Sequence, residues 1–203
     1  MATRTLRLRL PIAGRRLLLR VPVPTDASAI AAALRDRRVT RPIHLPAAYS
    51  IRDAREFIRR SKQGLEEGSK CNLFITLRRS GELIGGCGLD QIRLDHRNAH
   101  VGYWIAHPHW RKGYASEAAS LLISAGFRDL GLHRIHTGVF PDNPRSMRVL
   151  RRLGFRREGR ARADRVVDGR YRDLILFGLL RQEFRPFRPG RTAYRIPPLS
   201  GRA

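Results

Sequence analysis

The chain of 203 residues has little cysteine, few acidic side chains and no long apolar run. Two cysteines, Cys71 and Cys87, cannot build a disulfide framework or, by themselves, a zinc site, so both are expected to be small core residues. No run approaches the ~18 apolar residues that a membrane-spanning helix needs. The N-terminal residues alternate arginine with leucine and lack the continuous apolar core of a signal peptide. The sequence therefore predicts a cytoplasmic protein without membrane contact.

Acidic residues are far outnumbered by basic ones. There are 17 Asp and Glu against 41 Lys and Arg, and the formal net charge is +24. Such an excess fits an anionic partner, which could be a nucleic acid, an acidic protein or an anionic cofactor. Arginine is spread along the whole chain, however, as a generally arginine-rich composition would produce. The charge is compatible with association with ribosomal particles but does not single out RNA.

The length and the hydrophobic content of 42% suit one well-buried domain, whereas two would be cramped. We expect an N-terminal extension over residues 1–15, a domain over residues 16–184 and a flexible, proline- and arginine-rich basic tail over residues 185–203.

Hydrophobic periodicity and turn signals predict the elements of the domain. A first strand, at 16–23, could pair with residues 5–10, and Thr25 or Asp26 is expected to cap the helix that follows. Ser50 and Asp53 form a capping pattern for a second helix. The expected order is strand 16–23, helices 27–37 and 50–67, strands 72–78, 82–90 and 100–106, helix 114–130, strand 134–140, a helix from 143, and strands 155–162 and 171–180. This order predicts a mixed α/β sheet covered by helices.

The segment 107–119 combines the end of a strand, a basic turn and the start of a helix. Free backbone N–H groups and the positive end of the helix dipole converge at such a turn, which stabilises an anion. Gly113 allows close approach of the backbone to a ligand, and Arg111 and Lys112 add positive charge. The segment predicts a phosphate site, although many strand–turn–helix junctions share the local pattern.

A second pattern follows at 143–155. Asn143 stands where a helix N-cap is expected, and Ser146 lies one turn further on, so both side chains should emerge near the helix start. Gly154 ends this helix and Phe155 begins the next strand. Alone, the pattern describes no more than a capped helix.

Together, in this order and at this spacing, the two patterns resemble the GNAT acyl-CoA N-acyltransferases, and most closely their RimJ/RimL-type branch of ribosomal-protein-alanine N-acetyltransferases. The resemblance covers residues 16–182 and rests on residues 102–105, 113–118 and 143–155. It implies the GNAT fold, an α/β (α+β) structure whose mixed, largely antiparallel central sheet is flanked by helices. Trp110 departs from the family pattern, which has Gln or Arg three residues before the first glycine.

The resemblance implies acetyl-CoA as the acyl donor and no metal. The pyrophosphate would rest on the backbone of the turn, the pantetheine arm would run beside a central strand that splays from its neighbour, and a free N–H there could stabilise the oxyanion. The implied binding residues are Arg111, Lys112, Gly113, Tyr114, Ala115 and Ser116 at the turn, Trp104, Ile105 and Ala106 on the strand, and Asn143 and Ser146 near the pantetheine and its sulfur.

Two residues are candidates for catalysis. His100 stands where many family members have Glu and could act as the base, directly or through a water, or could merely shape the cleft. Ser146 is the expected proton donor to the thiolate, because Leu150 lies where many relatives place Tyr and no nearby Tyr is expected to substitute for it. Glu117, in the first helical turn, is expected mainly to compensate the helix dipole. Neither a metal-ligand cluster nor a Walker-type motif is present.

The leading hypothesis is an N-acetyltransferase, monomeric or homodimeric. It would transfer acetyl from acetyl-CoA to a primary amine by direct attack in a ternary complex. The expected acceptor is the N-terminal α-amino group of a protein, with ribosomal proteins as the favoured class. One alternative acceptor is a small-molecule amine such as an aminoglycoside, a polyamine or an amino acid, although sparse acidic residues argue against a polycation. The other alternative is a non-catalytic, basic RNA- or ribosome-binding module with a GNAT fold.

Overall fold

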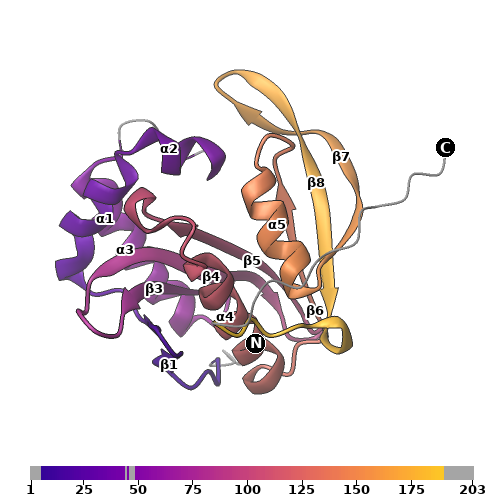
Figure 1. Cartoon of the computed structure of the whole chain (residues 1–203), viewed down its shortest axis with the longest axis horizontal. Coiled ribbons are helices and arrows are strands. Elements are labelled where there is room, and N and C mark those ends of the chain that lie inside the picture. The colour runs from indigo at the N-terminus through magenta and orange to yellow at the C-terminus, as the bar shows by residue number, and fades with distance from the viewer. Residues whose placement is uncertain (1–5, 44, 46–48, 190–203) are drawn as a thin grey trace.

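The computed structural model describes residues 6–43, 45 and 49–189, and its centre is an eight-stranded sheet (Figure 1). The strands follow the order β1-β2-β3-β4-β5-β6-β8-β7. Neighbouring strands are antiparallel except for β5 and β6, which are parallel. The prediction of a mixed, largely antiparallel sheet is confirmed. The strands are β1 (Ile12–Ala13), β2 (Leu17–Arg20), β3 (Cys71–Leu77), β4 (Leu83–Arg93), β5 (Asn98–Ile105), β6 (Arg134–Val139), β7 (Arg156–Val167) and β8 (Arg170–Leu180).

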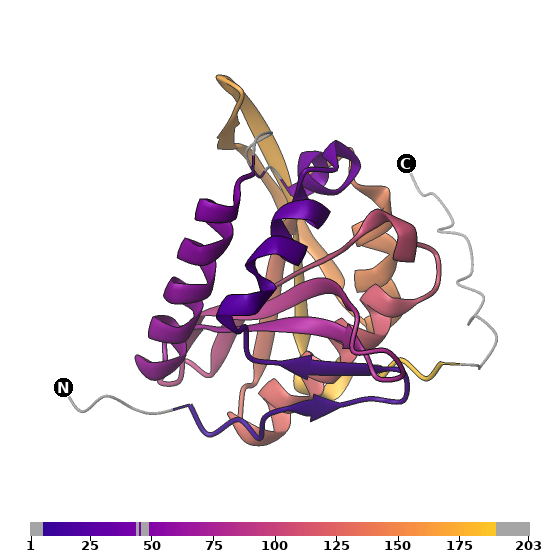
Figure 2. The same cartoon turned by 90° about the vertical axis from the view of Figure 1, so that its left-hand side faces the viewer.

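Helices cover both faces of this sheet (Figure 2). α1 and α3 pack on the face that carries Phe74, whereas α4 and α5 pack on the face that carries Leu73 and Ile75. The helices are α1 (Ala27–Leu34), α2 (Arg37–Thr40), α3 (Ile51–Glu66), α4 (Tyr114–Asp129) and α5 (Pro144–Leu153), with short 3₁₀ turns at Pro24–Asp26, Arg41–Ile43, His107–His109 and Arg181–Glu183. No helix in the described ranges combines the length and the apolar character that crossing a bilayer requires.

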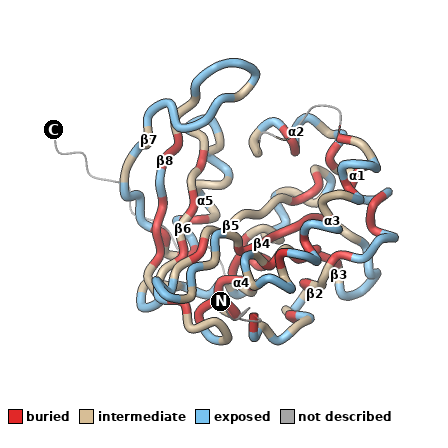
Figure 3. Tube along the Cα trace, turned by 180° about the vertical axis from the view of Figure 1, so that it is seen from behind, coloured by how far each residue is buried: buried red, intermediate tan, exposed pale blue. Residues whose placement is uncertain are grey.

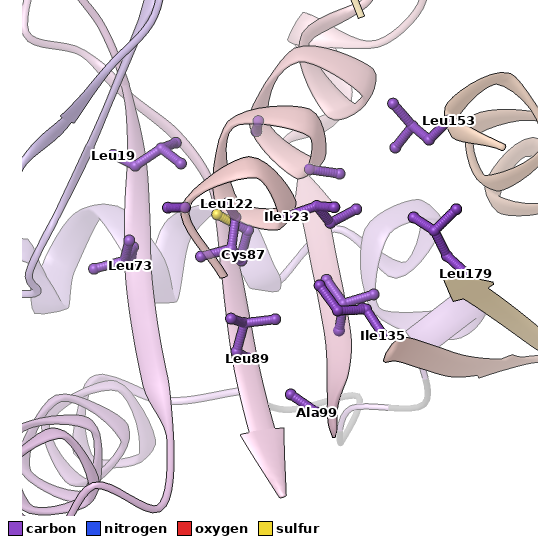
Figure 4. Close-up of a cluster of buried hydrophobic side chains, with 14 of the residues drawn as sticks. Leu19, Leu73, Cys87, Leu89, Ala99, Leu122, Ile123, Ile135, Leu153 and Leu179 are labelled. Carbon is purple, nitrogen blue, oxygen red and sulfur yellow. The ribbon is translucent and has the colours of Figure 1, made fainter. Parts of the chain in front are cut away.

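The larger core lies between the sheet and α4. Figure 4 shows Leu122 and Ile123 of α4 above strand residues such as Leu89 and Ile135. Burial is concentrated in the central strands, while β7 and the tip of the β7–β8 hairpin are exposed (Figure 3). The cysteines belong to this core as expected, and burial raises the pKa of the Cys71 thiol to about 12.

Local sequence signals account for several element boundaries. The Ser50 hydroxyl accepts the N–H of Asp53 at 3.2 Å and the Asp53 carboxylate accepts the N–H of Ser50 at 2.8 Å, so the capping box begins α3 as predicted. Asn143 caps α5 by accepting the N–H of Ser146 at 3.1 Å. Gly154 ends α5 with a φ of 98°, a left-handed conformation that favours glycine.

Three predictions about the N-terminal third are wrong. The tight turn in which the N–H of Gly14 donates to Leu17 O (2.8 Å) brings Ile12–Ala13, and not residues 6–10, opposite β2; residue 5 lies outside the described residues. Asp26 stands at the N-cap position of α1, but its side chain makes no capping hydrogen bond, because its carboxylate binds Arg20 at 2.6 and 2.8 Å and the Val23 N–H at 2.8 Å. The first helix also ends at Leu34, before residue 37.

The described parts of both end segments contact the domain. Ile12 is buried in the extension, and at the other end Phe184 packs against Phe127 with ring centroids 5.6 Å apart. The Phe187 N–H donates to Ser120 Oγ (2.9 Å), and the Pro189 carbonyl accepts from an Arg15 side-chain N–H at 3.0 Å. The boundary at residue 184 stays a prediction, and residues 190–203 lie outside the described residues.

A buried carboxylate fastens the start of the chain to α4. Glu117, only 3% exposed, accepts the backbone N–H of Arg16 at 2.9 Å and its Nε–H at 2.7 Å. Arg16 in turn donates to the carbonyl of Lys112 at 2.9 Å. Glu117 does lie in the first turn of α4, but its main partner is a guanidinium and not the helix dipole alone.

We therefore predict that Glu117→Gln lowers the free energy of unfolding by about 1.5–3 kcal/mol, because it weakens two hydrogen bonds that end on a buried charge. Urea denaturation at constant m-value would measure this change. Glu56→Gln is the control, because Glu56 makes exposed helical ion pairs with Arg59 and Arg60 that contribute little to stability. Equal midpoints for Glu117→Gln and the unsubstituted protein would contradict the structural role of Glu117.

Candidate active site

The parallel pairing of β5 with β6 is short. Only Asn98–His100 of β5 pair with Arg134–His136 of β6. Beyond this point β5 continues beside β4 to Ile105, and β6 continues beside β8 to Val139. The part of the sheet formed by β6, β8 and β7 consequently turns away from the part that contains β3, β4 and β5 (Figure 1). The splayed central strand that the resemblance implied is present.

Two cavities meet at this split. One, of about 450 Å³, lies beside the turn before α4 and beside α5; the other, of about 430 Å³, lies beside α1 and α3. We call them the turn cavity and the sheet cavity. Both are lined by the same six residues at their junction: Pro42, Ile43, Tyr103, Trp104, Asn143 and Ser146. Two molecules that enter from opposite sides could therefore meet at the junction.

The turn cavity has the features of an anion site. Gly113 is the N-cap of α4 with a φ of 78°, and no side chain caps the helix. The N–H groups of the first turn are therefore free of a side-chain acceptor and can bind an anion. Arg111 also has a positive φ, 62°, which is uncommon for a residue with a side chain and keeps the turn tight.

Positive charge in the turn cavity comes partly from three arginines of α5 that sequence reasoning did not assign to the site. Arg145, Arg148 and Arg152 of α5 line it. Their spacing of three and four residues puts them on one helix face, a signal that could have identified them. Trp110, which departs from the family pattern, donates from Nε1 to the Ile105 carbonyl at 2.7 Å, and the Arg145 guanidinium lies 4.5 Å from its ring centroid. Arg145 thus brings a cation beside the position where the family has Gln or Arg.

Most of the residues expected to hold the donor lie together. Ala106 and Lys112 are not among those that line the turn cavity: the Ala106 N–H donates to the Ile84 carbonyl at 2.8 Å, and the Lys112 carbonyl accepts from Arg16. The predicted residues that do line it are Trp104, Ile105, Arg111, Gly113, Tyr114, Ala115, Ser116, Asn143 and Ser146.

The junction contains a hydroxyl pair. Tyr103 Oη lies 3.0 Å from Ser146 Oγ and 3.3 Å from the Ser146 carbonyl. Burial raises the pKa of Tyr103 above its ordinary value, against a smaller lowering by the hydrogen bond to Ser146, so the phenol stays protonated at neutral pH. The expectation that no tyrosine lies near Ser146 is wrong. Strand alternation could have indicated Tyr103, because it shares the face of Val101 and Ile105 that α4 covers.

His100 lies in the sheet cavity, which Ser146 also lines. Its Nε2 is 3.3 Å from Thr137 Oγ1, and its Nδ1 is 3.2 Å from Asp90 Oδ1 without the angle of a hydrogen bond. The ring of His136 is 5.7 Å away. Burial lowers the pKa of His136, and the neighbouring His100 lowers it further, so His136 is neutral at physiological pH. Among the described residues, no three His, Cys, Asp or Glu side chains gather as metal ligands.

Comparison with known proteins agrees with this geometry. Residues 16–156 match the model of the acetyltransferase (GNAT) domain family. The uncharacterized N-acetyltransferase p20 of Bacillus licheniformis is 34% identical over 169 residues, which cover 83% of this chain and 95% of that protein. The ribosomal protein uS5-alanine N-acetyltransferase of Escherichia coli is 33% identical over 108 residues, which cover 53% of this chain and 56% of that enzyme.

A solved structure shares the fold as well. Mycobacterium smegmatis RimJ in complex with CoA-disulfide superposes with a TM-score of 0.75 and 25% sequence identity, covering 87% of this chain and 86% of that one. The family match includes the split between β5 and β6, the turn before α4 and the whole of α5, where the two cavities meet. The chain belongs to the GNAT family of N-acetyltransferases.

Proposed function

We propose that the protein acetylates the N-terminal α-amino group of a protein, with acetyl-CoA as the donor and ribosomal proteins as the favoured class of acceptor. The observation that carries the proposal is the meeting of two cavities at Tyr103, Asn143 and Ser146, on opposite faces of a split sheet. A donor can enter through the turn cavity and an acceptor through the sheet cavity, which suits direct attack in a ternary complex.

The residues of the turn cavity fit the donor. The uncapped N–H groups of α4 would hold the pyrophosphate, and Arg145, Arg148 and Arg152 supply cations for its negative charge. Trp104 and Ile105 at the end of β5 line this cavity, and Trp110 also lines it and donates to the Ile105 carbonyl. These residues form a wall beside which a pantetheine arm can extend. The M. smegmatis RimJ structure, which is a complex with CoA-disulfide, supports a CoA thioester as the donor.

The chemistry needs two proton transfers. Acetyl-CoA supplies a thioester, whose carbonyl carbon forms a bond to the amine nitrogen while its carbon–sulfur bond breaks. His100 would take the proton that leaves the amine, directly or through a water. Ser146 would give a proton to the departing sulfur while it accepts one from Tyr103, whose hydroxyl is 3.0 Å away, and Tyr103 would regain its proton from water when the products leave. A β5 N–H beyond His100 would stabilise the oxyanion.

The charge of the sheet cavity supports a polypeptide acceptor. Among the described residues that line it, Asp90 is the only carboxylate and none is Lys or Arg. A polyamine or aminoglycoside would lack partners for its further ammonium groups, and a free amino acid would lack a cation for its carboxylate. A protein N-terminus has one amine, and its first carboxyl group is in a peptide bond. The similarity to the uS5-alanine N-acetyltransferase supports a ribosomal acceptor.

We predict that isothermal titration gives acetyl-CoA binding with a Kd on the order of tens of micromolar or tighter. Arg148→Gln should weaken this binding about tenfold through the loss of a charge-assisted contact. Arg151→Gln is the matched control, because Arg151 lies three residues further along α5 and does not line the turn cavity. This variant should bind acetyl-CoA as tightly as the unsubstituted protein. Folded protein that shows no heat of binding in this range would refute the proposed donor.

For the base, we predict that His100→Gln lowers kcat about a hundredfold while the Kd of acetyl-CoA stays the same. A substitution without effect on kcat would leave His100 only a role in shaping the cavity.

For the hydroxyl pair, Tyr103→Phe and Ser146→Ala should each lower kcat by about a hundredfold, and the double substitution should cost little more than either alone. Such non-additivity is expected if both groups serve one proton transfer. Tyr171→Phe is the control, because Tyr171 is 74% exposed on the β7–β8 hairpin. Fully multiplicative effects in the double variant would contradict a shared path.

A further inference from the structure

Three glycines leave part of the sheet without side chains. Gly86 and Gly88 of β4 and Gly102 of β5 all line the sheet cavity. Gly88 pairs with Gly102, and Gly86 pairs with Trp104, so the three lie on one face of two adjacent strands. Gly86 also pairs with Phe74 of the neighbouring strand β3, and the Phe74 side chain packs against α1 and α3. The three glycines therefore lie on the face that these two helices cover. We call these residues the glycine floor.

None of the three glycines has a positive φ, so their backbone conformation does not require glycine. Their surroundings differ. A Cβ on Gly86 would meet the Trp104 indole, and one on Gly88 would meet the Asn72 side chain. A Cβ on Gly102 would meet no atom within 4 Å. Gly102 therefore faces open space, and the missing side chain at this position helps to form the cavity.

The walls above the glycine floor are largely apolar. Ile30 and Leu34 of α1, Tyr49, and Phe57 of α3 all line the cavity and belong to the smaller hydrophobic cluster. On the floor itself, the next cross-strand pair beyond Gly88 and Gly102 is Asp90 with His100. We call the part of the sheet cavity above the glycine floor the recess. It combines an apolar wall with one polar end.

We infer that Gly102 determines acceptor specificity: it opens an apolar recess for the side chain of the acceptor's first residue, so that the preferred acceptor is a polypeptide with an uncharged, apolar N-terminal residue. This inference rests on the proposed function. A charged side chain would lose its hydration in the recess without gaining a partner, since Asp90 already lies against His100. An apolar side chain gains burial on the same walls.

The test compares Gly102→Val with the unsubstituted protein on peptides that differ only in the first residue, which is Gly, Leu, Asp or Lys. The unsubstituted protein should show a kcat/KM for the Leu peptide at least about tenfold above those for the Asp and Lys peptides. Gly102→Val should lower the value for the Leu peptide about tenfold and that for the Gly peptide much less, because valine fills the recess. The Kd of acetyl-CoA should not change.

Gly159→Val is the matched control. Gly159 also lies on a strand without positive φ and has open space at its Cβ position, but it does not line the sheet cavity. It should leave both the activity and the peptide preference unchanged. Valine suits a strand, and Gly102→Ala is a smaller second variant should Gly102→Val lose its native circular dichroism. Gly102→Ala should lower the ratio of kcat/KM for the Leu peptide to kcat/KM for the Gly peptide, as Gly102→Val does.

The failures can be told apart. If peptides are acetylated without regard to the first residue, or with the same preference after Gly102→Val, the role of Gly102 is refuted while the acetyltransferase stands. If only spermidine or an aminoglycoside is acetylated, both the polypeptide acceptor and the role of the recess are refuted. If acetyl-CoA does not bind at all, the proposed function itself fails and the inference with it. When acetyl-CoA binds but transfer is too slow to measure, titration of the same peptides against the CoA-bound protein gives the comparison, and equal affinities would refute the inference.

Discussion

The short parallel contact between β5 and β6 is the constraint on which the rest of the site depends. Once their hydrogen bonding ends at His100, each strand keeps its other partner, β4 for β5 and β8 for β6. The sheet therefore opens without unfolding, and backbone groups that a continuous sheet would pair become available to a ligand. The opening also joins the two faces of the sheet. A cavity on the α4 and α5 side can thus meet a cavity on the α1 and α3 side at Tyr103 and Ser146.

The packing keeps the two parts of the sheet in place. α4 packs on the β2–β5 side through Leu122 and Ile123, and Leu153 of α5 and Leu179 of β8 belong to the same cluster (Figure 4). The turn before α4 is held by Arg16, which binds Glu117 in the first turn of α4 and donates to the Lys112 carbonyl within the turn. A rigid turn of this kind can present its N–H groups without reorganisation when an anion binds, which is the condition for strong electrostatic stabilisation.

Sequence reasoning predicted the features that local chemistry determines. The capping box at Ser50 and the N-cap of α5 at Asn143 depend on neighbouring residues, and both predictions are confirmed. Features that depend on register were missed. The hydroxyl contact of Tyr103 with Ser146 joins residues 43 positions apart, and the glycine floor exists only because Gly88 faces Gly102 across two strands. The pairing of β2 with Ile12–Ala13 was also missed, because a turn at Gly14 competes with a longer hairpin. Strand alternation indicates the face on which a residue such as Tyr103 lies, but it does not indicate which residue of another element lies opposite.

A crystal structure with acetyl-CoA, or with a non-reactive analogue of it, tests the two-sided site most directly. The pyrophosphate is expected at the N–H groups of residues 113–116, with the thioester carbonyl in the split between β5 and β6 and the sulfur beside Ser146. The sheet cavity should then stay open toward His100 for the acceptor. A donor bound outside the turn cavity, or an acetyl group pointing away from the junction of the two cavities, would contradict this arrangement.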